Sequence, residues 1–219
     1  IAIKAGGYGA DSHAEDMDMM TRMAVHMMNN KLEYKIGYIP LSCCWTEGPP
    51  TVKVLNRQRT RWARGLLQIF TIHRKYLFNR RYKQMGLITF PYIFMFEFLA
   101  PIIEFLGYLF TIYLLFFGGI NFNTVWIMLF FIYIAGLTLS FFTILFERKV
   151  SHMFTDREYI RLFFFCIVEP ILYHPLIVFF SIKGYIDFLS KKNFEWGQMT
   201  RQGFNTNTPR EEIRSSTAN

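Results

Sequence analysis

The feature that most restricts the fold of this chain is a stretch without any charged residue, between Glu104 and Glu147. It is long enough for two membrane-spanning helices of about 20 residues each. Turn-forming residues occupy positions 118–123, so we expect one span near residues 99–117 and the next near 124–146. Hydrophobic residues make up 52% of the chain and aromatic residues 19%, which favours an integral membrane protein over a soluble domain.

A third apolar stretch, residues 162–189, is interrupted by Glu169-Pro170 and His174-Pro175. We interpret it as a broken pair of helices, re-entrant or in the membrane plane. Four basic residues follow the second span: Arg148, Lys149, Arg157 and Arg161. The positive-inside rule therefore places this loop in the cytoplasm. A broken pair would return the basic tail, residues 191–219, to the same side, and we expect the end of this tail to be disordered.

The segment before the spans is strongly basic. No acidic residue occurs between Glu47 and Glu97, and the chain as a whole carries a formal net charge of +8. Such a block suits a phosphorylated ligand or an anionic membrane leaflet. Nucleic acid is a poorer match, because the block runs directly into a membrane span. The three cysteines form neither an even-numbered disulfide set nor a metal site, which indicates reduced, cytosolic thiols.

Residues 57–64 concentrate four arginines, a glutamine and a tryptophan in about two helical turns. In a helix, Gln58, Arg61 and Trp62 share one face. That face combines phosphate-binding donors with a flat apolar platform. A simpler interpretation is a basic helix at the membrane surface, with the tryptophan at the lipid interface. Apolar residues recur every three to four positions from Leu55 onward, so we expect residues 54–98 to form interface helices with their apolar side toward the bilayer.

Residues 1–53 have the pattern of a soluble α/β domain. A glycine turn at Gly6-Gly7 precedes a helix that starts near Glu15, and residues 34–40 alternate like a short strand. The chain begins at Ile1, within what reads as a fold, and we expect it to be the C-terminal part of a longer protein.

Four motifs in this order resemble the family 2 membrane glycosyltransferases, which include cellulose, chitin, hyaluronan and poly-N-acetylglucosamine synthases. The matching pieces are Gly6-Gly7-Tyr8, Glu15-Asp16-Met17-Asp18, Thr46-Glu47-Gly48-Pro49-Pro50-Thr51 and Gln58-Arg59-Thr60-Arg61-Trp62. Membrane spans follow them. The resemblance implies the C-terminal portion of a glycosyltransferase-A-type α/β domain in residues 1–53, interface helices in 54–98, transmembrane or re-entrant helices in 99–190, and a cytosolic gating-like segment with a disordered tail in 191–219.

The resemblance also implies roles for individual residues. Asp16 would be the general base that deprotonates the acceptor hydroxyl, and Glu15 would orient it or contact the acceptor. Gln58 and Arg61, helped by Arg59, would bind the diphosphate. Trp62 would stack on the terminal acceptor sugar. Near the end of the chain, Trp196 and Arg201 resemble a gating segment that closes over the nucleotide, although a membrane-surface tryptophan beside a basic tail fits equally well.

One displacement at the anomeric carbon would invert its configuration, so that an α-linked UDP-sugar gives a β-linked product. A Mg²⁺ or Mn²⁺ ion would bind through the diphosphate. The family's metal-binding Asp-x-Asp lies upstream of this chain, and we do not read Asp16-Met17-Asp18 as that site. Acidic residues in apolar segments are functional candidates by default; here they are Glu97, Glu104 and Glu169, with His174 beside them.

Three hypotheses remain for the function. The first is a processive synthase in the plasma membrane that polymerises a UDP-sugar at the cytosolic face and passes the chain through its spans. The second is a non-processive enzyme that glycosylates a lipid. The third is a non-catalytic membrane scaffold. Expected partners are the UDP-sugar donor, a saccharide or lipid-linked acceptor, the bilayer and an accessory membrane subunit.

Overall fold

The computed structural model describes residues 1–9, 12–37, 39, 44, 46–118, 121–150 and 154–191. Its α-helices are α1 (Glu15–Asn29), α2 (Val52–His73), α3 (Phe90–Ile93), α4 (Ala100–Phe117), α5 (Phe122–Val150), α6 (Asp156–Val168) and α7 (His174–Leu189). Short 3₁₀ turns, Arg74–Tyr76 and Arg80–Tyr82, follow α2. Three π-helical segments, Met85–Thr89, Phe94–Leu99 and Glu169–Tyr173, join their neighbours into longer helices.

The described residues contain no β-strand, so the α/β part of the expected fold is not confirmed. The strand predicted at residues 34–40 is irregular wherever the structure describes it. Alternating side chains favour an extended backbone, but a strand also needs a partner to satisfy its backbone hydrogen bonds. None of the described residues provides that partner.

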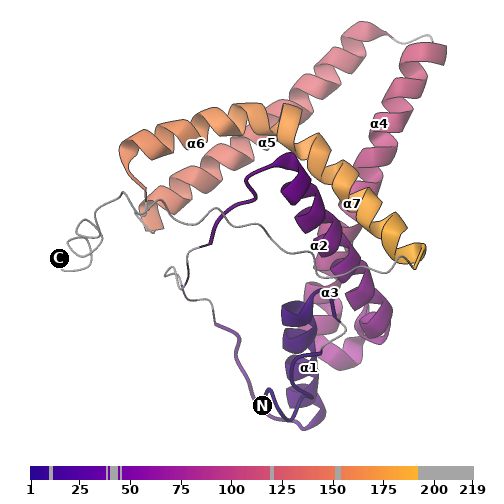
Figure 1. Cartoon of the computed structure of the whole chain (residues 1–219), viewed down its shortest axis with the longest axis vertical. Coiled ribbons are helices and arrows are strands. Elements are labelled where there is room, and N and C mark those ends of the chain that lie inside the picture. Colours follow the sequence, from indigo (N-terminus) through magenta and orange to yellow (C-terminus); the bar gives the residue numbers. More distant parts are fainter. Residues whose placement is uncertain are drawn as a thin grey trace.

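Helix α2 is the central element of the fold. Its first turn is capped by Thr51, whose hydroxyl accepts a hydrogen bond from the Val54 backbone N–H at 3.3 Å. Helix α2 lies alongside α7 (Figure 1). The two backbones approach closely at Gly184, where a Cβ atom would lie 2.6 Å from the Thr60 carbonyl oxygen. A glycine is needed here because any side chain would push the helices apart.

The apolar side of α2 is covered by protein, which corrects the expectation that it faces the bilayer. Ile69 is 1% exposed, and it packs with Leu66 and Phe70 in the main hydrophobic cluster. That cluster also contains Ala24 and Val25 of α1 and aromatic residues of the segment after α2. Helical periodicity shows that one side of α2 is apolar, but it cannot distinguish a lipid partner from a protein partner.

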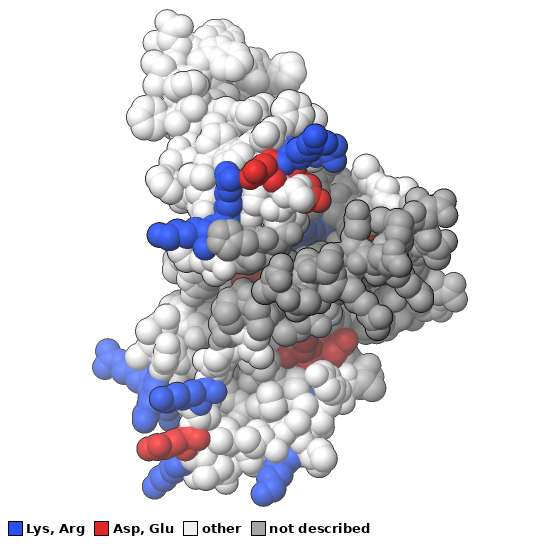
Figure 2. All heavy atoms as spheres, turned by 90° about the vertical axis from the view of Figure 1, so that its left-hand side faces the viewer, with Lys and Arg blue, Asp and Glu red and all other residues white. Residues whose placement is uncertain are grey.

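Three helical stretches among the described residues are long and apolar enough to cross a membrane: Met85–Phe117, Phe122–Val150 and Asp156–Leu189. The first two contain the spans predicted at residues 99–117 and 124–146. The first also extends back to Met85, with Pro91 just after the junction between the π-helical segment Met85–Thr89 and α3. At their far end these two helices carry no charge on the face shown in Figure 2.

The third stretch bends between α6 and α7 (Figure 1), at the π-helical segment Glu169–Tyr173. The interruption therefore lies where the prolines predict it, because Pro170 and Pro175 each remove a backbone donor from the helical ladder. Its re-entrant or in-plane placement in the bilayer stays a prediction.

Candidate active site

The start of α1, the middle of α2 and two apolar helices surround a cleft of about 460 Å³. Five residues of the family-like motifs line it: Glu15, Asp16, Arg59, Arg61 and Trp62. The cleft also has four polar lining residues outside that set: His13, Glu97, Ser181 and Tyr185. Three carboxylates, two guanidinium groups and an indole thus share one concave surface.

Helix α1 presents Asp16 at its first turn, where carboxylates are favoured by the helix dipole. The Asp16 side chain is exposed, and its Oδ1 accepts a hydrogen bond from the Met17 backbone N–H at 2.8 Å. The preceding residues hold the helix start against α2. The His13 backbone N–H donates to Gln68 Oε1 at 3.0 Å, and a Cβ atom on Gly65 would lie 2.9 Å from the Ala14 Cβ.

Helix α2 presents the arginines and the indole. The Arg59 guanidinium carbon lies 4.7 Å from the centroid of the Trp62 ring, within cation–π range. Arg59 Nη2 donates to the Tyr173 hydroxyl at 3.1 Å. The Nε atom of Arg59 is buried and has no hydrogen-bond partner among the described residues. Trp62 remains 48% exposed, so much of the indole is accessible beside this anchored arginine.

The apolar helices supply a wall that the motif pattern does not predict. Glu97, from the π-helical segment before α4, lines the cleft together with residues of α1, α2 and α7. The Tyr185 hydroxyl of α7 donates toward the backbone carbonyl oxygens of Phe98 and Glu97, at 3.3 and 3.4 Å. Of these two side chains, only Glu97 stands out in the sequence, as an acid in an apolar run. Nothing in the sequence distinguishes Tyr185 from other tyrosines.

Gln58 does not line the cleft, although it shares a helical face with Trp62. It lies one turn, about 6 Å, closer to the start of α2, whereas the start of α1 packs over the later turn at Gly65. Its predicted role in diphosphate binding stays a prediction. Trp196 and Arg201, the candidate gating residues, lie outside the described residues.

His13 adds a titratable group to the cleft. Burial lowers the pKa of its imidazole, and the positive charges of Arg64 and Arg61 lower it further, while Glu15 acts in the opposite direction. The imidazole is therefore held in its neutral form at lower pH than an ordinary histidine. The positive charge of the cleft comes from its arginines.

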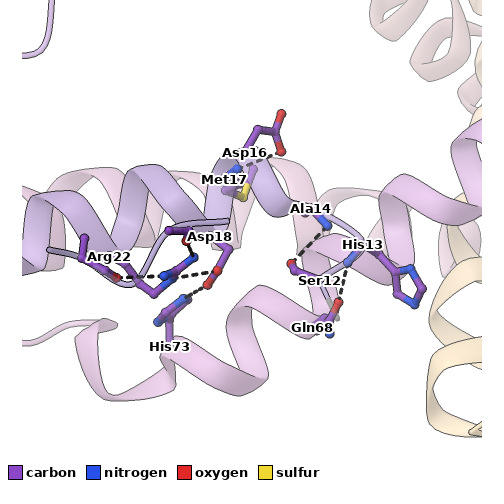
Figure 3. A network of polar contacts seen from close by, with 11 residues as sticks. Ser12, His13, Ala14, Asp16, Met17, Asp18, Arg22, Gln68 and His73 are labelled. Carbon is purple, nitrogen blue, oxygen red and sulfur yellow. Dashed lines mark hydrogen bonds and ion pairs between the residues drawn. The ribbon is translucent and has the colours of Figure 1, made fainter. Parts of the chain in front are cut away.

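Asp18 lies on the side of α1 opposite Asp16 (Figure 3). It accepts hydrogen bonds from His73 Nε2 at 2.7 Å and from Arg22 Nε at 2.8 Å, and its side chain is only 9% exposed. The structure buries His73 beside this carboxylate. The motif pattern missed this contact because its partners are 55 positions apart.

The described residues contain no group of three or more His, Cys, Asp or Glu side chains placed to hold a metal ion. Asp16-Met17-Asp18 matches the Asp-x-Asp pattern of a metal-binding motif, but its two carboxylates point to opposite sides of α1 (Figure 3). They therefore cannot converge on one cation.

Residues 4–143 match the sequence model of the family described as Glycosyl transferase family group 2. The chain is 39% identical over 83 residues to the probable glycosyltransferase YdaM of Bacillus subtilis, a match that covers 34% of this chain and 18% of that protein. It is 38% identical over 87 residues to a poly-beta-1,6-N-acetyl-D-glucosamine synthase of Staphylococcus epidermidis, covering 36% of this chain and 21% of the synthase. The matched region thus spans about a fifth of the length of these relatives. No solved structure matches the chain.

Proposed function

Because this chain belongs to glycosyl transferase family group 2, we propose that its cleft is the acceptor side of an inverting sugar-transfer site at the cytosolic face of the plasma membrane. The donor is a UDP-sugar, and the product is a β-linked polysaccharide that passes through the apolar helices. The observation that carries the proposal is the shared cleft of Asp16, Arg61 and Trp62.

Each of these side chains suits one part of the reaction. A hydroxyl is a weak nucleophile until a positioned carboxylate takes its proton, and Asp16 is an exposed carboxylate on the cleft wall, at the first turn of α1. Arg61 and Arg59 offer donors for the negative charge that develops on the departing diphosphate. Trp62 offers an apolar face for a sugar ring, and Gln58 would reach the diphosphate from the neighbouring turn.

The Arg59 guanidinium supports an anionic or hydroxyl-rich ligand, because it lines the cleft beside the Trp62 ring and guanidinium groups donate strongly to phosphate oxygens. Glu97 supports a polymer that leaves through the apolar helices, since it places a carboxylate where the cleft meets them. A Mg²⁺ or Mn²⁺ ion on the diphosphate would neutralise leaving-group charge. The described residues contain no group of side chains that could hold this ion.

The experiment is radiolabel transfer by the full-length protein in membranes, with UDP-N-acetylglucosamine and UDP-glucose tested side by side. Two relatives are named poly-beta-1,6-N-acetyl-D-glucosamine synthases, which favours the first donor. Label in a polymer supports the proposal. Label in an organic-extractable product indicates a lipid acceptor instead, and no transfer from any UDP-sugar indicates a non-catalytic membrane subunit.

A further inference from the structure

We propose that Asp18 is a positioning residue, whose buried contact with His73 sets the placement of the catalytic carboxylate relative to the arginine and indole of α2. This inference rests on the proposed function of Asp16. Asp18 does not line the cleft, and it would act only through the position of α1.

The contact joins two of the elements that line the cleft, α1 and α2. Asp18 is two residues after Asp16 on α1, and His73 is the last residue of α2. The two side chains are 9% and 5% exposed and lie 2.7 Å apart, so the contact is shielded from water. Hydrogen bonds to a charged group are stronger than neutral ones, and losing one partner of a buried pair costs more than losing an exposed contact.

Each partner is itself held in place. The His73 ring stacks on Tyr76, with centroids 5.5 Å apart, and meets Phe90 edge-on. These aromatic residues belong to the main hydrophobic cluster at the entry to the first apolar helix. The imidazole is therefore a rigid anchor, and α1 is tied to it through one carboxylate.

Arg22 extends the same network to the glycine turn. Its guanidinium donates to Asp18 Oδ2, to the Ala5 carbonyl oxygen at 2.8 Å and to the Gly7 carbonyl oxygen at 2.5 Å. Gly6 and Gly7 both have positive φ, at 99° and 65°, a conformation that glycine adopts without strain. Asp18 thus accepts hydrogen bonds from both Arg22 and His73 (Figure 3). It connects α1 to the end of α2 directly, and to the glycine turn through Arg22.

The geometry explains why the motif carries a second aspartate two positions after the first. Residues two apart on a helix differ by about 200° in direction, so a cleft-facing Asp16 puts Asp18 on the packed side. A displacement of about 1 Å at a reacting group can cost about a hundredfold in rate. A small shift of α1 would therefore reduce transfer without removing the nucleotide-binding arginines.

The first test compares Asp18→Asn with Asp156→Asn, in the full-length protein. Asp156 forms an exposed ion pair with Arg148 and is the matched control. Asp18→Asn is expected to lower kcat at least tenfold, while UDP affinity and the amount of folded protein change less than about twofold. His73→Gln keeps a donor and should retain most of the turnover, whereas His73→Leu should match Asp18→Asn. Unchanged kcat in Asp18→Asn, or equal loss in both His73 variants, would overturn the proposal.

The second test does not depend on sugar transfer. Nitroxide labels at Met20 on α1 and Thr71 on α2, both exposed, report the distance between the helices in a background whose native cysteines are replaced. A narrow distance distribution in the parent protein should become broad in Asp18→Asn and stay narrow in Asp156→Asn. If the parent protein transfers no sugar, the proposed function fails, and this measurement still decides whether Asp18 places α1. An unchanged distribution in Asp18→Asn would refute that placement.

Discussion

The Arg59 guanidinium is held between the Trp62 ring, 4.7 Å from its centroid, and the Tyr173 hydroxyl, which accepts a hydrogen bond at 3.1 Å. Tyr173 belongs to the π-helical segment at the bend of the third apolar stretch. One arginine therefore connects the aromatic platform of the cleft to the helices proposed to carry the product away. Substitutions of either Trp62 or Tyr173 should therefore alter the position of the Arg59 guanidinium in the cleft.

Replacing Trp62 with alanine removes the platform. We expect the acceptor KM to rise about tenfold, because aromatic contacts contribute about 0.5–1.5 kcal/mol beyond the area they bury. Trp62→Phe keeps a flat ring and should lose much less. Initial rates at varied acceptor concentration check this, with UDP affinity measured in parallel. A larger loss in UDP affinity than in acceptor use would count against stacking.

Tyr173→Phe removes the hydroxyl that anchors Arg59 and leaves the ring. Turnover should fall about two- to fivefold, which corresponds to the roughly 0.5–1 kcal/mol expected for a partly exposed hydrogen bond. Tyr113→Phe, on an exposed side of α4, is the control and should behave like the parent protein. If both variants kept full activity, the hydrogen bond between Arg59 and Tyr173 would not contribute to turnover.

Gly184→Ala tests the packing of α2 on α7. The new Cβ would lie 2.6 Å from the Thr60 carbonyl oxygen and 2.7 Å from the Ala63 Cβ, so the helices must separate. Overpacking of this kind costs about 1–3 kcal/mol. Gly136→Ala, in α5, has nothing within 4 Å of its new Cβ and should leave stability unchanged. Thermal unfolding of both variants in detergent gives the comparison, and equal melting temperatures would contradict the close approach.

The pKa of His13 predicts how stability depends on pH. Because the folded state lowers this pKa below the ordinary histidine value of 6.5, the unfolded state binds more protons at pH values between the two. The stabilising effect of a neutral His13 is therefore complete above pH 6.5 and is lost as the pH falls from 6.5 through the lowered pKa of the folded state. Unfolding midpoints from pH 8 to pH 5 should show a shallower acid-side decline in His13→Gln. Identical slopes would mean that His13 is not the titrating group.

Local signals in the sequence predict much of the fold. The uncharged run between residues 104 and 147 predicts α4 and α5, because spanning a membrane needs length and apolarity alone. The prolines predict the bend near residues 169–175 for a similar reason, since they remove backbone donors. The order of the motifs predicts that Asp16 and Trp62 belong to one site, and the structure places both on the same cleft.

Contacts between distant positions could not be predicted. Asp18 and His73 are 55 positions apart, and the contact of Tyr185 with the Glu97 backbone spans 88 positions. No periodicity within either segment encodes such a pair. The same limit explains the covered side of α2, where Ile69 packs into a protein core that its own helix does not reveal.

The central claim is tested most directly by Asp16→Asn in the full-length protein, which keeps the size of the side chain but removes the proton acceptor. We predict that radiolabel transfer from the UDP-sugar falls by about 10²–10⁴-fold while UDP binds with the affinity of the parent protein. Asp16 is exposed, so the variant should fold normally. Transfer at the parental rate would contradict the account, because another group would then have to accept the proton.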